Sequence, residues 1–260
     1  MRFFLIFLLF ATPSWAQDSR LLSLQTGHAS KGWEAVGRLD ISGKGFCTAA
    51  LISDQMILTA AHCLFDDTGE PISTERFVFE AGLRNGRAEA SRGITKALAH
   101  PGYQHLGSNR NTAEIATDIA ILSLAQPIRN GRIKPYPIAS EPRDGEEIGI
   151  VSYARDRAEA PSIQDVCSVL GRQTGVLLMS CSIDFGASGA PVFKVENGEA
   201  HIVSVVSAMA DAGGKRISLG TSLAEPLAYL LQEFDRIGGA NGQIIQGGQR
   251  QDTGAKFLRP

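Results

Sequence analysis

The stretch CSIDFGASGAPVF places Ser188 among small residues, directly before a strand-like Pro-Val-Phe run. A serine on such a turn could attack an acyl carbon, but only if a base takes its proton and a third group orients that base. Taken alone, the stretch is also typical of an ordinary glycine-rich loop, because glycine adopts backbone angles that other residues avoid. A catalytic role for Ser188 therefore requires a histidine and an acid elsewhere in the chain.

Among the five histidines, His62 has the most distinctive surroundings. It follows the strand-like run 56–59 and stands directly beside Cys63. A lone histidine next to an apolar run is more often structural than catalytic, so its position alone does not make His62 a base.

The elements that would hold these residues are mostly strands. Short apolar or alternating runs such as RFVFEAG, IAILSLA and HIVSVVSA are separated by Gly, Asn, Asp and Pro. Many short strands at this spacing predict an all-β fold, either a sandwich or barrels. One helix is expected near the end, with Pro226 in its first turn, Gly238 at its stop and an apolar face at intervals of three and four: Leu223, Leu227, Leu230, Leu231 and Phe234.

The first sixteen residues predict a secretory signal peptide. Arg2 precedes an unbroken apolar run, residues 3–10, and Ser14-Trp15-Ala16 offers small residues for cleavage, so we expect the mature chain to begin near Gln17. The run is too short to span a bilayer, although an N-terminal anchor is the alternative interpretation. No later segment is apolar and long enough to cross a membrane, and residues 238–260 are expected to form a flexible tail.

Composition limits the classes of partner and site. Lys and Arg number 25 against 27 Asp and Glu, with no basic stripe, so nucleic acid is not expected as a partner. The four cysteines, Cys47, Cys63, Cys167 and Cys181, allow three pairings. They contain no Cys-x-x-Cys pair, so no metal site is predicted, and export favours two disulfides over four free thiols.

Three short words in chain order carry a family resemblance. GFCTAALIS with LTAAHC surrounds His62, TDIAIL contains Asp118, and GASGAP contains Ser188. Together they resemble the trypsin- and chymotrypsin-like serine proteases, in style closest to bacterial exported members such as the glutamyl endopeptidases. The α/β-hydrolases run Ser, Asp, His instead and would have glycine where this chain has Ala190.

The resemblance extends from about residue 33 to 237 and implies two antiparallel six-stranded β-barrels with a C-terminal helix. Residues 33–126 would form the N-terminal barrel, 127–143 a linker, and 144–237 the C-terminal barrel and helix. Residues 17–32 would be an N-terminal segment or a propeptide. The implied protein is a secreted or periplasmic serine endopeptidase that acts on proteins or peptides, needs no cofactor and contacts no membrane after signal cleavage. The oligomeric state stays open.

The family's catalytic roles map onto individual residues here. Ser188 would be the nucleophile, His62 the general base, and Asp118 the group that orients the imidazole. The backbone N–H groups of Gly186 and Ser188 would form the oxyanion hole. The resemblance also implies the disulfide Cys47–Cys63, which leaves Cys167–Cys181 as the second.

The residues expected to bind substrate depart from the trypsin pattern. Ser182, six residues before Ser188, would form the pocket base and carries no charge, so a preference for Arg or Lys is not supported. Ser207, Ala208 and Met209 would pair with the substrate backbone. Met209 either narrows the pocket, which favours small or apolar side chains, or belongs to the core.

Ala187 bears on how the protein would be activated. It has no charge to pair with a new amino terminus, so activation by such an ion pair is not expected.

The alternatives to a protease are a catalytically silent binding module and an acyl (ester) hydrolase. Intact residues at all the expected catalytic positions argue against the first, and the residue order with the β-rich pattern argues against the second.

Overall fold

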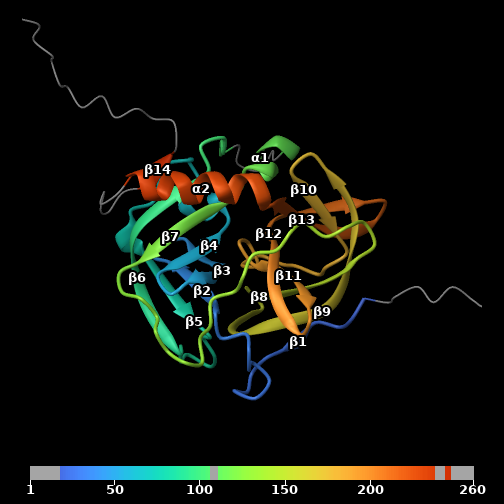
Figure 1. Ribbon diagram of the computed structural model, residues 1–260, viewed down its shortest axis with the longest axis horizontal. Coiled ribbons are helices and arrows are strands. Elements are labelled where there is room, and N and C mark those ends of the chain that lie inside the picture. The colour runs from blue at the N-terminus through green and yellow to red at the C-terminus, as the bar shows by residue number, and fades with distance from the viewer. Residues whose placement is uncertain (1–17, 106–110, 238–243, 247–260) are drawn as a thin grey trace, which may run out of the picture.

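The computed structural model describes residues 18–105, 111–237 and 244–246, which fold into two barrels side by side (Figure 1). The N-terminal sheet has the strand order β14-β6-β5-β2-β3-β4-β7 and closes through a β6–β7 pairing. Its antiparallel strands are β2 (Val36–Ile41), β3 (Gly45–Ser53), β4 (Met56–Thr59), β5 (Phe77–Ala81), β6 (Ala90–Ala99) and β7 (Ala120–Leu124). The short strand β14 (Ile244–Gln246) adds to β6 in parallel.

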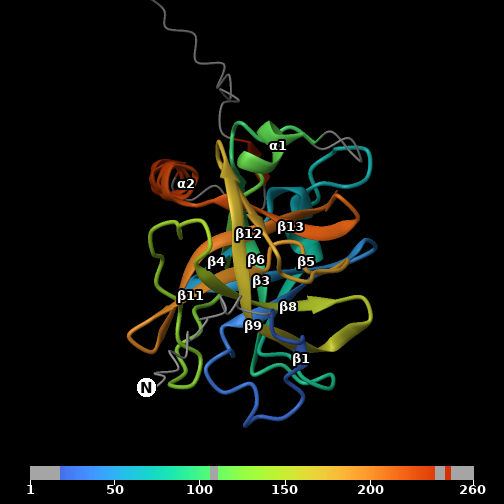
Figure 2. The same ribbon diagram turned by 90° about the vertical axis from the view of Figure 1, so that its right-hand side faces the viewer.

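The C-terminal sheet has the order β1-β9-β10-β13-β12-β11-β8 and closes through a β8–β9 pairing. Its strands are β8 (Glu147–Ala154), β9 (Arg157–Gln173), β10 (Val176–Met179), β11 (Pro191–Glu196), β12 (Glu199–Ala212) and β13 (Lys215–Ser222). The two-residue strand β1 (Leu22–Ser23) lies along the outside of β9 (Figure 2). The predicted fold of two antiparallel six-stranded barrels with a C-terminal helix is confirmed.

Alternation of apolar side chains explains why these runs become barrel strands. In β5 the side chains of Phe77 and Phe79 are buried while Val78 between them is exposed. A strand with this period of two presents one face to a barrel interior and the other to solvent.

An aromatic cluster joins the two barrels. Trp33 precedes β2, Tyr136 lies in the connection between the barrels, and Phe193 lies in β11. The ring centroids of Tyr136 and Phe193 are 4.7 Å apart, and those of Trp33 and Phe193 are 5.0 Å apart. Burial raises the pKa of the Tyr136 phenol, which therefore stays neutral and donates to the Gly32 carbonyl at 2.9 Å. Tyr136 thus anchors the connection by packing into the core beside both barrels.

The predicted C-terminal helix is α2 (Ala224–Ile237), with Pro226 in its first turn. Leu227 and Leu230 are buried against the core, whereas Leu231 is 37% exposed and lies outside the buried face. The helix is anchored to the N-terminal barrel by Lys96 of β6, whose ammonium donates to the Phe234 carbonyl at 2.7 Å. That ammonium also lies 3.8 Å from the Phe234 ring centroid, and its burial lowers the pKa of Lys96.

Three short helical turns were not expected from the sequence: η1 (Ala61–Leu64), η2 (Thr74–Arg76) and α1 (Thr112–Ala116). α1 begins at an asparagine cap, because the Asn111 side-chain oxygen accepts from the Glu114 backbone N–H at 2.9 Å.

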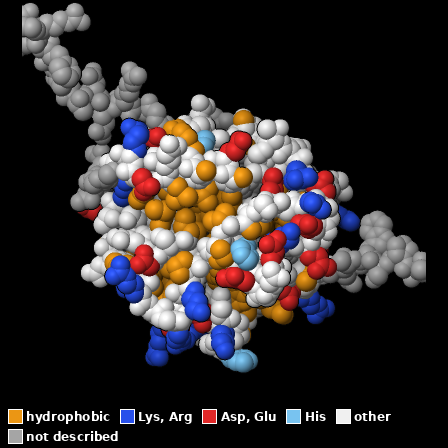
Figure 3. Space-filling model, in the orientation of Figure 1, with side chains coloured by type: hydrophobic (Ala, Val, Ile, Leu, Met, Phe, Trp, Pro, Cys, Tyr) orange, Lys and Arg blue, Asp and Glu red, His pale blue; other side chains and the backbone are white. Residues whose placement is uncertain are grey.

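The ends of the chain differ in how far the structure describes them. Residues 1–16, the expected signal peptide, lie outside the described residues, as does Gly238. Within the expected tail, residues 244–246 form β14, and the rest is not described. No helix in the described part combines the length and apolarity needed to span a bilayer. On the face shown in Figure 3, acidic and basic side chains are interspersed around hydrophobic groups that gather near α2.

Candidate active site

Strand register brings His62 and Asp118 to the same end of the N-terminal barrel. β4 ends at Thr59, which pairs antiparallel with Ala120, the first residue of β7. His62 lies in η1, just after β4, and Asp118 stands two residues before β7. The end of one strand and the start of its antiparallel neighbour lie side by side, so the two residues meet although 56 positions separate them.

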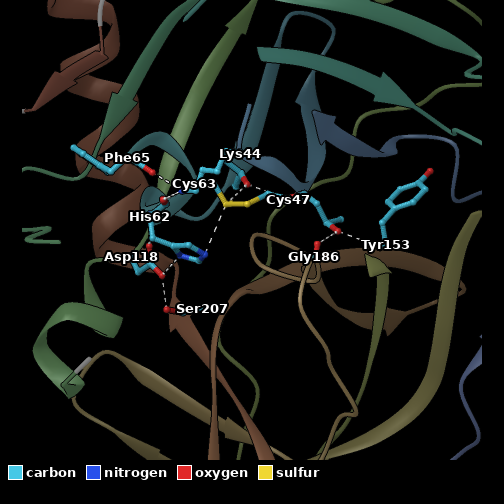
Figure 4. Close-up of a disulfide and its surroundings, with 11 residues drawn as sticks. Lys44, Cys47, His62, Cys63, Phe65, Asp118, Tyr153, Gly186 and Ser207 are labelled. Atoms are coloured by element: carbon cyan, nitrogen blue, oxygen red, sulfur yellow. Dashed lines mark hydrogen bonds and ion pairs between the residues drawn. A yellow bond between two sulfur atoms is a disulfide. The ribbon is translucent and has the colours of Figure 1, made fainter. Parts of the chain in front are cut away.

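The carboxylate of Asp118 holds His62 at two points (Figure 4). Its Oδ2 lies 2.7 Å from His62 Nδ1, and its Oδ1 accepts the His62 backbone N–H at 2.8 Å. Asp118 is completely buried, and the Ser207 hydroxyl also donates to its Oδ2. Because Nδ1 of His62 is hydrogen-bonded to this carboxylate, Nε2 is the ring nitrogen that can exchange a proton with groups in the cleft.

Ser188 lies on a constrained turn between β10 and β11. The glycines two before and one after it, Gly186 and Gly189, have φ of +99° and +78°. A Cβ on Gly189 would lie 2.0 Å from Thr59 Oγ1 and 2.3 Å from the Thr48 carbonyl oxygen. Both the backbone angle and the lack of space therefore require glycine at position 189.

The N-terminal barrel holds this turn through Thr48 of β3. The Thr48 backbone N–H donates to the Ser188 carbonyl at 2.8 Å, and its hydroxyl donates to the Gly186 carbonyl at 2.9 Å. Thr48 also accepts the Tyr153 backbone N–H at 3.1 Å. This buried threonine was not predicted, and its only signal in the sequence is its place beside Cys47.

Replacing Gly189 by alanine is expected to destabilise the protein by about 3–5 kcal/mol, because backbone strain and overpacking add at this position. Gly198 in the β11–β12 turn is a matched control, since its φ is +81° but nothing lies within 4 Å of the position that an alanine Cβ would take. Gly198→Ala should cost only about 1 kcal/mol, from strain alone. Urea unfolding of both variants checks the difference, and equal costs would contradict the steric argument.

The backbone N–H groups of Gly186 and Ser188 donate to no other group in the described part of the chain. In the same region Gly189 N–H donates to the Val206 carbonyl at 2.8 Å, so its hydrogen-bonding capacity is used. The two N–H groups expected to form an oxyanion hole are thus the ones that the turn leaves available beside the cleft.

A cleft of about 500 Å³ brings most of the predicted site residues together: His62, Gly186, Ser188, Ser207, Ala208 and Met209 all line it. Ser182 instead lines a neighbouring cavity of about 250 Å³, which shares Ile183, Asp184 and Met209 with the cleft. Met209 is half-buried and lines both spaces, so it does not belong to the core alone. Ser207 was predicted to pair with substrate, and its contact with Asp118 was missed.

Ser188 and His62 both line the cleft. A hydrogen bond between a serine hydroxyl and its base commonly tightens only once a substrate is bound.

Two disulfides brace the site. Cys47–Cys63 ties β3 to η1, the turn that carries His62, and Cys167–Cys181 ties β9 to the segment leading to Ser188. Both pairings agree with the prediction. Lys44 reinforces the first by donating to the His62 carbonyl at 3.2 Å and to the Phe65 carbonyl (Figure 4). Cys47, His62 and Cys63 approach one another as metal ligands would, but both sulfurs are consumed in the disulfide.

The sequence of this chain is similar to a family model and to several known proteins. The family model Trypsin matches residues 25–225. The chain is 31% identical over 105 residues to Trypsin from Phaedon cochleariae, which covers 40% of this chain and 36% of that protein. It is 32% identical over 105 residues to Granzyme M from Rattus norvegicus, covering 38% and 34%. Transmembrane protease serine 9 from Rattus norvegicus is 29% identical over 110 residues, covering 41% and 10%.

The matched part spans less than two fifths of each of these relatives. Among solved structures, a Glu endopeptidase in complex with MPD superposes with a TM-score of 0.68 at 17% identity, covering 85% of this chain and 98% of that one. At that identity the likeness shows the fold.

Proposed function

Since the chain belongs to the trypsin family, we propose that it is a serine endopeptidase that hydrolyses peptide bonds with Ser188 as nucleophile, His62 as base and Asp118 as orienting group. The observation that carries the proposal is the buried Asp118 carboxylate, which accepts both the backbone N–H and the Nδ1 side of His62 at the edge of the cleft that Ser188 lines. We also propose that the protein is exported, because two disulfides persist in oxidising compartments.

In the first half of the reaction, Ser188 Oγ attacks the carbonyl carbon of the scissile bond while His62 Nε2 takes the hydroxyl proton. The same nitrogen then gives that proton to the leaving amine, which leaves an acyl-enzyme on Ser188. In the second half, water attacks the acyl carbon and gives a proton to Nε2, the bond from that carbon to Ser188 Oγ breaks and releases the acid, and Nε2 returns the proton to Oγ. Asp118 keeps Nδ1 protonated throughout and stabilises the imidazolium that forms.

The N–H groups of Gly186 and Ser188 would stabilise the oxyanion that develops on the attacked carbonyl. Donors fixed by a rigid turn need no rearrangement at the moment of reaction, and losing one such donor costs about 10²–10³ in kcat. The glycine conformations and the Thr48 contacts support this role, because they fix the backbone from which both N–H groups project.

The test is labelling of the purified protein with a fluorophosphonate probe, with the adduct located by mass spectrometry and Ser188→Ala as control. Labelling at Ser188 followed by cleavage of a peptide library supports the proposal. Labelling with cleavage of esters but not peptides would assign an acyl hydrolase instead. A folded protein that neither labels nor cleaves would be a silent binding module, and the proposed activity would be wrong.

Met209 gives a prediction about side-chain preference. We expect Met209→Gly to raise kcat/KM for peptides with a large aromatic residue before the scissile bond by about tenfold relative to alanine peptides, because the methionine occupies space between the cleft and the neighbouring cavity. Met56→Gly, on β4 of the other barrel and outside both spaces, is the control. An unchanged ratio for Met209→Gly would show that this side chain does not limit the pocket.

A further inference from the structure

Residues 18–24, here called the N-terminal strap, are bound along β9 of the C-terminal barrel. Leu22 and Ser23 pair with Ile163 and Ser162, and the Leu24 N–H donates to the Pro161 carbonyl at 2.8 Å. Ser19 docks next to Val166 with three hydrogen bonds: its N–H donates to the Val166 carbonyl at 2.8 Å, its hydroxyl donates to the same carbonyl at 3.1 Å, and that hydroxyl accepts the Val166 N–H at 2.9 Å.

One buried side chain connects the strap to the wall of the cavity beside the cleft. Gln164 of β9 is only 2% exposed. Its amide nitrogen donates to the Ser19 carbonyl at 3.0 Å, and its amide oxygen accepts the Ser182 backbone N–H at 2.7 Å. The orientation of the amide is fixed, because a flipped side chain would set donor against donor and acceptor against acceptor.

The residues at the far end of this bridge shape the space next to the catalytic cleft. Ser182 lines the cavity of about 250 Å³, and its neighbour Ile183 lines both that cavity and the cleft. The strap contributes Leu21 to the same cavity. A second link runs beside it, since the Ser180 hydroxyl donates to Asp18 of the strap at 2.8 Å.

We propose that Gln164 is a positioning residue that couples docking of the N-terminal strap to the shape of the substrate side-chain cavity. On this proposal residues 18–24 of the N-terminal strap contribute to substrate binding in the folded enzyme. The inference rests on the proposed function, in which this cavity receives a substrate side chain. The Gln164 bridge itself consists of two neutral hydrogen bonds and needs no terminal amine.

Kinetics of Gln164→Met and Gln164→Glu test the coupling, with Gln173→Met as a control on the exposed end of the same strand. Gln164→Met loses both bridging hydrogen bonds, and the ionised form of Gln164→Glu loses the one to the Ser19 carbonyl. Both variants should therefore raise KM for peptides by about tenfold. The changes in kcat and in the rate at which a small fluorophosphonate labels Ser188 should be smaller. The control should match the wild type. An unchanged KM, or a fall confined to kcat, would overturn the proposal.

The pH dependence of KM in Gln164→Glu distinguishes loss of the hydrogen bonds from loss of packing. An ionised carboxylate can accept from Ser182 but cannot donate to the Ser19 carbonyl, whereas the protonated acid can do both. The ratio of the variant's KM to that of wild type should therefore fall toward one as the pH is lowered through the pKa of the carboxyl. A ratio that does not vary with pH would count against the bridge.

Amide hydrogen exchange tests the coupling between the strap and residues 180–186 without relying on activity. In Gln164→Met we expect residues 18–24 and 180–186 to lose protection together, and Gln173→Met to leave both unchanged. Ser19→Ala, which removes the hydroxyl contacts with Val166 without touching the barrel interior, should loosen the same two segments to a lesser degree. Loosening of only one segment would overturn the coupling. If the wild type neither labels nor cleaves, the proposed function fails, and the exchange pattern still tests the bridge.

Discussion

Alanine at His62 is expected to lower kcat by about 10⁶-fold, and adding Ser188→Ala to that variant is expected to lower it hardly further, because residues that act as one unit are strongly non-additive. Without the imidazole, no group is placed to take the Ser188 proton, so a serine hydroxyl that remains in place is as inactive as a missing one. The reverse order of mutation should give the same result.

The measurement is kcat of the two single variants and the double variant on one peptide. His201→Ala, which replaces a histidine on β12 of the other barrel, is the matched control and should stay within about twofold of wild type. Losses that multiplied in the double variant would mean that His62 and Ser188 act in separate steps, which would contradict the proposed mechanism.

Local signals in the amino-acid sequence predict the all-β class and the C-terminal helix, whereas the two six-stranded barrels were predicted through the family resemblance. Alternating runs such as Phe77–Ala81 specify strands, and the spacing of Leu227 and Leu230 specifies the helix that buries them. The disulfide partners were also predicted, but through family resemblance, since four cysteines alone allow three pairings.

What the sequence could not predict depends on contacts between distant segments. Thr48 supports the Ser188 turn only because β3 of one barrel faces the turn of the other, and its place beside Cys47 does not predict that contact. Ser207 was expected to face substrate, yet its hydroxyl donates to Asp118 across 89 positions. β1 has two residues and β14 three, lengths at which periodicity carries no information.

These missed contacts share one physical origin. Each is a hydrogen bond that satisfies a polar group inside the interface between segments, where an unpaired group would cost about 1–3 kcal/mol. Sequence motifs identify the groups that could do chemistry, whereas the structure shows the buried polar groups that hold them: Thr48 for the Ser188 turn, Ser207 for Asp118, and Gln164 for the segment around Ser182.

Asp118→Asn is expected to lower kcat by about 10⁴-fold while the protein stays folded. The carboxylate accepts from the His62 backbone N–H, from the Nδ1 side of the ring and from the Ser207 hydroxyl. Asparagine has a single acceptor oxygen. If that oxygen stays on the backbone N–H, the amide NH₂ group faces Nδ1, which must then give up its proton. The ring proton moves to Nε2, so the imidazole presents a donor to Ser188 and cannot act as its base.

The same substitution at Asp211, an exposed acid on β12 that accepts the Gly214 N–H at 2.9 Å, is the control for a general effect of removing a carboxylate. We expect Asp211→Asn to keep kcat within about twofold of wild type. Thermal unfolding of both variants separates lost chemistry from lost folding. If folded Asp118→Asn lost less than about tenfold in kcat, the buried carboxylate would not be setting the tautomer of His62, and its three donors would instead serve only to hold η1 against β7.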